Sequence, residues 1–256
     1  MKLKPPSPSE LGDRLRDTEV WKSIFRPGSV FRKGYKDTSR DRALATMNNV
    51  LYHLHPTKVK RHGLKLTYTF CLGGLSFFLF IVLTVTGIFL MFFYRPTADL
   101  GGAQAYADMQ SIRTTVFFGD WMRNMHRWGA HLMVFSVTLH MARVFYTGAY
   151  KPPREFNWVV GVILLFLTLG LSFTGYLLPW DQLSIWAVTV GTSLGGYAPF
   201  IAKQANFLLL GGAVVGPNTL LRWYVLHVLA LPFVLVLFLA VHFWRIRKDG
   251  GISGPL

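Results

Sequence analysis

The sequence predicts an all-α integral membrane protein built on a bundle of four transmembrane helices. Of its 256 residues, 52% are hydrophobic and only 15% are charged, whereas a soluble domain usually carries about 25% charge. The apolar residues are concentrated in four segments, each long enough to cross the hydrocarbon core, which takes roughly 20 residues. A large soluble core would not divide in this way, so we expect four membrane spans.

The four predicted spans differ in the polar side chains that they contain. The first and third are free of charged residues, the second contains three arginines and three histidines, and the fourth contains two histidines and a proline. Tryptophans lie near most of the predicted ends, as in the aromatic belt at a membrane interface. The spans cover residues 66–94, 121–146, 158–178 and 220–244.

Basic residues are concentrated ahead of the first span. The chain has a net charge of +15, and 15 of its 27 lysines and arginines lie in residues 1–65. A nucleic-acid-binding protein gathers its basic residues on one face of a folded core, so we expect no nucleic-acid partner. We interpret residues 1–65 as a basic cytoplasmic N-terminal arm and residues 66–256 as the membrane domain.

The charges of the loops predict which way the spans run. The long connections 95–120 and 179–219 contain few basic residues, whereas the turn 147–157 and the end of the fourth span are basic. Because basic loops stay in the cytoplasm, both termini and the short turn are expected on the cytoplasmic, negative side of the membrane. The two long connections are then on the opposite, positive side.

Four histidines inside the spans form the candidate site, because ionisable residues within a membrane are costly and usually functional. The second span contributes His126 and His140, fourteen residues apart, and the fourth contributes His227 and His242, fifteen apart. Fourteen helical residues rise about 21 Å and return to within about 40° of the starting direction. Fifteen rise about 22.5 Å and end about 60° away, so each helix presents two imidazoles on roughly one face.

The direction of the spans decides how these histidines pair. The second and fourth spans run the same way, so we expect His126 opposite His227 at an upper, positive-side level and His140 opposite His242 at a lower, negative-side level. Two imidazoles facing each other at one depth suit six-coordinate haem iron, and helix bundles hold such cofactors in their cores. A lone helix histidine is more often a hydrogen-bonded polar group, but four at matched depths predict two haem b groups.

Glycines in the other two spans repeat the interval of the second. Each of these spans has two glycines fourteen residues apart, namely Gly73 and Gly87, and Gly161 and Gly175. We expect them to let the helices approach a flat macrocycle closely. The alternative is the small-residue packing that is common between membrane helices.

Two arginines of the second span lie beside its histidines. Arg127 follows His126, and Arg143 comes one turn after His140. Haem propionates would emerge at these levels, and arginine pairs well with carboxylates. The alternative is that both side chains extend along apolar surface to reach the interface.

Six motifs give the chain a resemblance to the cytochrome b6 family, the core subunits of cytochrome b6f complexes and of related bacterial menaquinol:cytochrome c reductases. The motifs are FCLGG at 70–74, YRPT at 94–97, RNMHRW at 123–128, KPPREFNW at 151–158, TGYLLPWDQ at 174–182 and GISGPL at 251–256. The resemblance covers about three quarters of the chain. The histidine spacing of fourteen and fifteen also resembles this family, because the longer mitochondrial-type cytochromes b have fourteen on both helices.

The resemblance implies cofactors that the spacing does not show. Cys71 is the single cysteine, so the residues alone exclude an intrachain disulfide and a CxxCH attachment site. In the family, the cysteine of FCLGG carries a c-type haem through one thioether bond, which implies the same for Cys71. The family also oxidises quinol on the positive side and reduces quinone on the negative side, with menaquinone, plastoquinone or ubiquinone as the substrate.

Quinone-site residues and partners are implied in the same way. Pro179, Trp180 and Asp181 are candidates for the oxidation pocket, and Arg247 is a candidate for the reduction site or an inside anchor. The expected partners are a Rieske iron–sulfur protein, a c-type cytochrome, membrane lipid, and a subunit IV-like protein that supplies the family's PEWY-type segment. We expect the complex to be a homodimer, and this chain to be its core subunit, with no catalytic residue of its own and no activity alone.

The same features predict a location in the cell, and they leave two alternative functions open. We expect a multi-pass protein of the bacterial inner membrane with both termini in the cytoplasm; the thylakoid membrane is the alternative location. A di-haem membrane anchor of a dehydrogenase or hydrogenase would explain the histidines but not FCLGG, PWDQ or GISGPL. A haem-free transporter could instead use the intramembrane histidines as a proton relay.

Overall fold

The computed structural model describes residues 7–18, 21, 25, 38–41, 43, 61–98, 104–197, 202–212 and 214–249, and within these the regular structure is entirely helical. Three helices are long and apolar enough to cross a membrane: α5 (Leu72–Met91), α8 (Glu155–Leu177) and a continuous helix over Pro217–Lys248. The prediction of an all-α membrane bundle is therefore confirmed. Most of the arm 1–65, where α1 (Pro8–Asp17) is described, and the motif at 251–256 lie outside the described residues.

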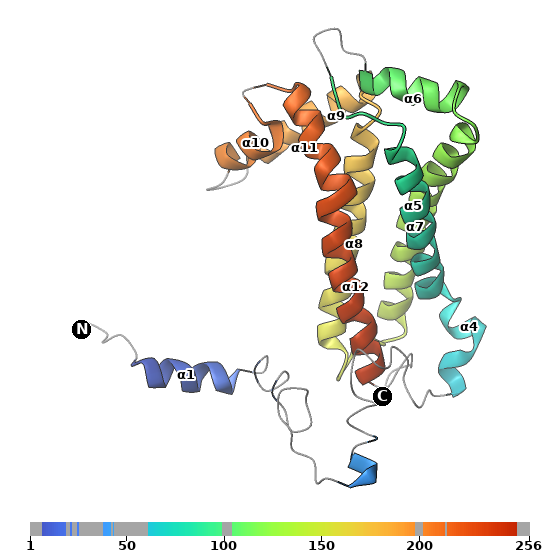
Figure 1. Ribbon diagram of the computed structural model, residues 1–256. Coiled ribbons are helices and arrows are strands. Elements are labelled where there is room, and N and C mark those ends of the chain that lie inside the picture. Colours follow the sequence, from blue (N-terminus) through green and yellow to red (C-terminus); the bar gives the residue numbers. More distant parts are fainter. Residues whose placement is uncertain are drawn as a thin grey trace.

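A fourth long helix, α7 (Gly119–Tyr146), lies alongside α5 (Figure 1). Its 28 residues extend for about 42 Å, which exceeds the thickness of the hydrocarbon core. It is less apolar than the other three because it contains three arginines and three histidines. The count of four spans stays a prediction that rests on this helix.

The long helices pack as two pairs. Helix α5 packs on α7, and α8 packs on α12 (Leu231–Lys248), while α7 also contacts α8. Each pair has a small buried cluster of its own, made of Leu79, Met133 and Val137 in the first pair and Val160, Leu164 and Leu235 in the second. Phe80 contacts both clusters. No comparably close packing joins α7 to α12 among the described residues.

The first span is interrupted where the sequence predicted one continuous helix from residue 66. A short helix, α4 (Leu66–Thr69), ends at Phe70, and α5 begins only after Cys71. Both residues have left-handed backbone conformations, with φ of 49° and 52°, which a helix cannot continue through. The interruption makes Cys71 the N-cap residue of α5 and leaves its side chain exposed.

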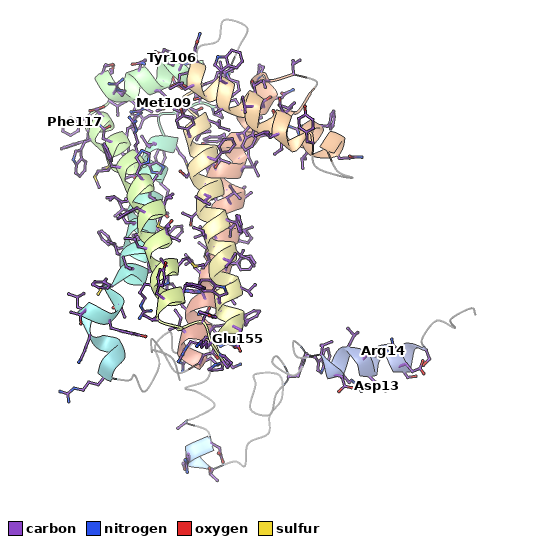
Figure 2. The ribbon with its side chains drawn as sticks, turned by 180° about the vertical axis from the view of Figure 1, so that it is seen from behind. Asp13, Arg14, Tyr106, Met109, Phe117 and Glu155 are labelled. Atoms are coloured by element: carbon purple, nitrogen blue, oxygen red, sulfur yellow. The ribbon has the colours of Figure 1, made fainter. Side chains whose placement is uncertain are left out.

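The two long connections contain helices that gather at one end of the bundle (Figure 1). They are α6 (Gln104–Thr114) in the first connection, and α9 (Gln182–Gly195) and α10 (Ala202–Leu210) in the second. Figure 2 shows Tyr106, Met109 and Phe117 at this end, and Glu155, which begins α8, at the other. The sequence-based interpretation had treated both connections only as loops.

Two polar contacts hold this end together. The hydroxyl of Tyr94 donates to the carbonyl of Leu178 at 2.6 Å and joins the end of α5 to the end of α8. The Arg95 guanidinium donates two hydrogen bonds to Asp108 of α6, at 2.7 and 3.0 Å. The hydrogen bond from Arg95 lowers the pKa of Asp108.

A buried ionic cluster closes the opposite end. Arg245 in the last turn of α12 lies 3.0 Å from Asp249 and donates to the carbonyl of Pro153. Arg154, which precedes α8, donates to the backbone carbonyl of Asp249 at 3.3 Å. The sequence-based interpretation counts both arginines only as positive charges of the cytoplasmic side, whereas the exposed fractions are 7% for Arg245 and 8% for Arg154.

Candidate cofactor site

The four span histidines form two facing pairs. The ring centres of His126 and His227 are 6.2 Å apart, and those of His140 and His242 are 6.5 Å apart. The ring planes are close to perpendicular in both pairs, at 77° and 80°. The structure thus brings together the residues that the direction of the spans paired; their role as axial ligands stays a prediction.

The separation of the upper pair fits one metal ion between two imidazoles, and that of the lower pair is about 0.1 Å longer than the expected range. Two imidazole nitrogens at about 2.0–2.1 Å from a shared ion, each about 1.1 Å from its ring centre, would place the centres roughly 6.2–6.4 Å apart. Within the described residues, no group of three or more His, Cys, Asp or Glu side chains could hold a bare metal ion. Two imidazoles alone would leave most of a coordination sphere unfilled, and a haem macrocycle would supply the four missing nitrogens.

A π-helical turn sets the direction of His227. The helix over 217–248 consists of α11 (Pro217–Val225), the π-turn η2 (Leu226–Ala230) and α12. In η2 the N–H of Leu231 bonds to the carbonyl of Leu226, five residues back, so the turn accommodates one extra residue. The fifteen residues between His227 and His242 therefore include one more than the fourteen of α7, and the π-turn takes up the extra residue that would add to the rotation of a regular helix. Pro232, which lacks an N–H, and the spacing of fifteen rather than fourteen residues are the sequence features that accompany this irregularity.

Each of the four glycines singled out in the sequence lies against one of the four histidines. An added Cβ at Gly87 would lie 3.2 Å from Cε1 of His126, and one at Gly175 would lie 2.6 Å from Cε1 of His227. At the lower level, the corresponding distances are 3.2 Å from Gly73 to His140 and 4.0 Å from Gly161 to His242. The glycines therefore make room for the imidazoles themselves, which the sequence-based interpretation did not foresee.

The upper histidines are also held by hydroxyl groups. The Oγ1 atom of Thr86 lies 2.9 Å from Nδ1 of His126, and Oγ1 of Thr174 lies 3.0 Å from Nδ1 of His227. Both threonines are buried. Each directly precedes a glycine that lies against the same histidine, a pattern that the sequence contains and that the sequence analysis missed.

Arginines near the two levels differ in how they are placed. Arg143 is half-buried, donates to the carbonyl of Tyr68 at 3.1 Å, and has a buried Nη2 with no hydrogen-bond partner among the described residues. Arg123 is half-buried and has an unpartnered buried Nε within the same part of the chain. Arg127 is exposed. Arg123, which the sequence-based interpretation did not single out, is therefore better placed than Arg127 to meet a buried carboxylate.

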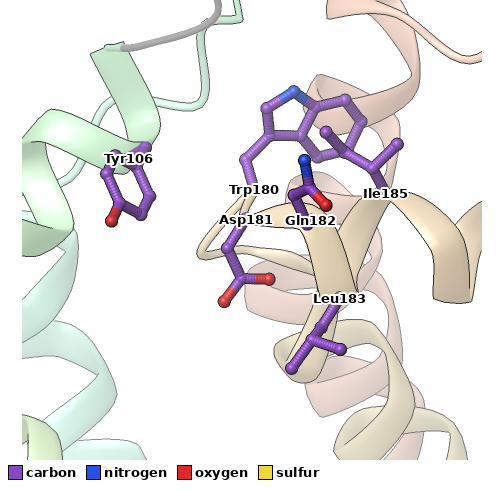
Figure 3. Close-up of a pocket in the computed structure, with 6 residues that line it drawn as sticks. All are labelled: Tyr106, Trp180, Asp181, Gln182, Leu183 and Ile185. Carbon is purple, nitrogen blue, oxygen red and sulfur yellow. The ribbon is translucent and has the colours of Figure 1, made fainter.

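The other predicted residues lie at the two ends of the bundle. Cys71 is two residues before Gly73, at the level of the lower pair. Trp180 and Asp181 line a cavity of about 430 Å³ together with Tyr106, Gln182, Leu183 and Ile185, and Figure 3 shows Tyr106 of α6 on the side opposite Asp181. Pro179 precedes this cavity, and Arg247 lies far from it in the last turn of α12.

Asp181 also has a local structural role. One of its carboxylate oxygens, Oδ1, accepts hydrogen bonds of 2.8 Å from both the backbone N–H and the hydroxyl of Ser184. This interaction caps the first turn of α9, as aspartate does at many helix N-termini. The cap accounts for the position of Asp181 at the mouth of the cavity.

The fold and the site together define a helical membrane protein in which two pairs of imidazoles lie at two heights along the bundle. The family model described as "Cytochrome b/b6/petB" matches residues 58–250. The chain belongs to the cytochrome b/b6 family. Membership of this family implies haem b binding and makes the chain a cytochrome b subunit of a quinol oxidoreductase, whose enzymatic activity is that of the whole membrane complex.

Individual relatives agree with this assignment. The chain is 47% identical over 202 residues to cytochrome b6 of Heliobacterium modesticaldum, an alignment that covers 79% of this chain and 91% of that protein. It is 46% identical over 187 residues to cytochrome b6 of Tupiella akineta, with 73% and 85% covered. A chain of the solved "Hyperthermophilic respiratory Complex III" is similar with a TM-score of 0.66 and 29% identity, over 86% of this chain and 55% of that one. This chain therefore spans about half of the Complex III chain.

Proposed function

We propose that this chain holds two haem b groups, one between His126 and His227 and one between His140 and His242. Its function would be to move electrons across the membrane, from quinol oxidised on the positive side to quinone reduced on the negative side. The two facing imidazole pairs, at heights fourteen residues apart on α7, carry this proposal. Bound haem iron would supply the one-electron chemistry, while the chain supplies the ligands and their surroundings.

The remaining helices shape the space around each pair. Gly73 and Gly87 of α5, and Gly161 and Gly175 of α8, keep these helices from blocking the imidazoles. Phe80 lies midway between the two glycines of α5 and contacts both buried clusters, so it would separate the two levels. Each level would then be a separate compartment of the bundle.

Arginine side chains would neutralise the haem propionates. The unpartnered buried nitrogens of Arg143 and Arg123 each require an acceptor, because leaving a buried donor unpaired is costly. A propionate at each level would supply one. Arg127, exposed on α7, would meet a carboxylate only at the surface of the bundle.

Cys71 would carry a covalent c-type haem on the negative side. Its thiol is exposed at the N-terminus of α5, two residues before the glycine that lies against His140. A thioether there would attach a third haem next to the lower pair. The cysteine resembles the attachment residue of the family in its FCLGG motif.

The cavity beside α9 would form part of the quinol-oxidation site, with Pro179, Trp180 and Asp181 on one side and Tyr106 on the other. Arg247, at the negative-side end of α12, would contribute to the quinone-reduction site. Menaquinone, plastoquinone and ubiquinone share the head-group chemistry that such sites bind. The sites would be completed by other subunits.

The proposed complex contains a subunit IV-like protein, a Rieske iron–sulfur protein and a c-type cytochrome, and it is a homodimer. The basic turn before α8 and the basic end of α12 support a cytoplasmic location for this end of the bundle. The chain would be a multi-pass protein of a bacterial inner membrane, with a basic arm at residues 1–65 and a membrane domain at 66–256. The thylakoid membrane is the alternative.

The experiment that tests this function is purification of the intact complex, followed by a reduced-minus-oxidised spectrum and haem-stained denaturing electrophoresis. We expect a b-type alpha band with two haem b per copy of the chain, and haem stain on its 29.0 kDa band. Two haem b without stain would favour a di-haem anchor of another enzyme over the proposed complex. A spectrum without an alpha band would contradict both.

A further inference from the structure

The two histidine levels differ in the residue that precedes each glycine. At the upper level this residue is a threonine, and at the lower level it is apolar. The four dipeptides are Thr86–Gly87 and Thr174–Gly175 above, and Leu72–Gly73 and Val160–Gly161 below. Each glycine lies against a histidine, and at the upper level the preceding threonine also places its hydroxyl within hydrogen-bond distance of that histidine. An aliphatic residue, which has no such hydroxyl, occupies the matching position at the lower level.

The hydrogen-bond directions at the upper level follow from the threonine hydroxyls. Thr86 donates to the carbonyl of Val82 at 2.7 Å, and Thr174 donates to the carbonyl of Leu171 at 3.1 Å. A hydroxyl has only one hydrogen to donate, so with that hydrogen on the backbone carbonyl the oxygen accepts from the imidazole Nδ1, which then carries a hydrogen.

This protonation leaves Nε2 of both upper histidines free of hydrogen and available to bind iron. It also polarises the ring, because an imidazole that donates a hydrogen bond through Nδ1 becomes a more basic ligand through Nε2. The lower level lacks an equivalent arrangement at His242, whose buried Nδ1 has no hydrogen-bond partner within the described part of the chain.

We propose that Thr86 and Thr174 are positioning residues of the upper haem and that they hold its midpoint potential below the value it would have without their hydroxyls. This inference rests on the proposed function. A more basic axial ligand stabilises ferric over ferrous iron, and hydrogen bonding around the ligands is a main control of haem potential. The threonines would thus make the upper level the better electron donor, which favours transfer toward the lower level.

The test is a redox titration of the purified complex that follows its b-type alpha band in Thr86→Val and Thr174→Val variants. Valine keeps the shape of threonine and removes the hydroxyl. We expect the potential of one b component to rise, the same one in both variants and further in the double variant, while the other component stays unchanged. Thr86→Ser and Thr174→Ser keep the hydroxyl and should return the potential toward that of the unmodified complex.

Thr168→Val is the matched control. Thr168 is a buried threonine of α8 that donates to the carbonyl of Leu164 at 2.8 Å and makes no hydrogen bond to a histidine. This control should leave both potentials in place. If the valine variants keep both haems with unchanged potentials, or if Thr168→Val causes the same shift, the inference is wrong.

Loss of the upper haem would also be decisive. If the valine variants lose it while the serine variants keep it, the hydroxyl is required for binding, and the inference is supported. Loss in the serine variants as well would show that threonine acts by packing and would overturn the inference. An unmodified complex without two b components would instead contradict the proposed function, so the two failures are distinguishable.

Discussion

One added carbon atom at Gly175 would lie 2.6 Å from Cε1 of His227, closer than non-bonded atoms approach each other. The same atom at Gly74, on α5, would have no neighbour within 4 Å. The space around each imidazole therefore depends on individual glycines and not on glycine content. The absence of a Cβ atom at particular glycines thus gives the imidazoles their space.

Gly175→Ala should displace His227 and weaken binding of the upper haem. Overpacking of this kind costs roughly 1–3 kcal/mol, and the lower haem should stay bound because Gly175 contacts only the upper pair. Quantification of haem b per chain in the purified complex measures the effect, and Gly74→Ala is the control that should bind both haems. Equal haem content in the two variants would show that the glycine is not needed.

His140→Ala should abolish the lower haem b and leave the upper one at least partly assembled. His140 faces His242, whereas the upper pair lies about 21 Å away along α7. His131→Ala is the matched control, since His131 is an exposed residue of the same helix that contacts Trp128 rather than either pair. Retention of both haem b groups in His140→Ala would contradict the assignment of levels.

The scale of elements shows where local backbone geometry departs from regular helices. The π-turn at Leu226–Ala230 brings His227 into line with His242, and the break at Phe70 and Cys71 separates α4 from α5. Helix α6 is held by the contact of Asp108 with Arg95. Each irregularity positions a residue of the candidate site or closes an end of the bundle.

Asp108→Asn should loosen α6, with a pH dependence that follows from the lowered pKa of Asp108. A carboxyl whose folded-state pKa lies below its ordinary value of about 3.9 stabilises the fold above that pH, and this contribution is lost as the pH falls through the lowered pKa. The unmodified protein should therefore approach the variant as the pH falls through this lowered pKa. Hydrogen exchange of the α6 amides measures this, and we expect several-fold faster exchange in the variant at neutral pH.

Asp120→Asn is the control for this prediction. Asp120 also faces an arginine, Arg113 at 3.6 Å, but both side chains are about half exposed, and such pairs contribute little. Its exchange should match that of the unmodified protein. If both variants exchange alike, the contact of Arg95 with Asp108 does not hold α6.

Spacing and composition were sufficient to predict an all-α membrane bundle and the facing histidines, because hydrophobic length and helical periodicity are properties of the sequence itself. They could not predict the π-turn, because an inserted residue looks like ordinary helix until the backbone is known; Pro232 marked only its vicinity. They also missed Thr86 and Thr174, because a threonine that bonds its own helix backbone is common in apolar helices. Only the structure shows that the hydroxyl of each of these two threonines lies within hydrogen-bond distance of a histidine Nδ1.

At the scale of the whole molecule, the bundle consists of two helix pairs, α5 with α7 and α8 with α12, and polar contacts lie at both of its ends. Tyr94 links α5 to the end of α8 at one end, and the cluster of Arg154, Arg245 and Asp249 links α8 to α12 at the other. The middle of the bundle, where the histidines face one another, has no comparable contact between α7 and α12 in the described chain. Such a bundle leaves space for cofactors between the pairs.

Arg245→Gln should destabilise the whole bundle, because it leaves the buried Asp249 carboxylate without its 3.0 Å partner. Breaking one side of a buried ion pair costs about 3–5 kcal/mol. Thermal unfolding of the purified complex should therefore begin several degrees lower. The double variant Arg245→Met with Asp249→Leu should recover part of the loss, and an unchanged unfolding temperature in Arg245→Gln would show that the cluster does not join α8 to α12.

A density map of the intact complex is the most direct test of the site. We predict flat density for a macrocycle between His126 and His227 and between His140 and His242, with both rings of each pair directed at its centre. Imidazoles turned toward lipid, or in contact with each other with nothing between them, would contradict the assignment of these four residues as haem ligands.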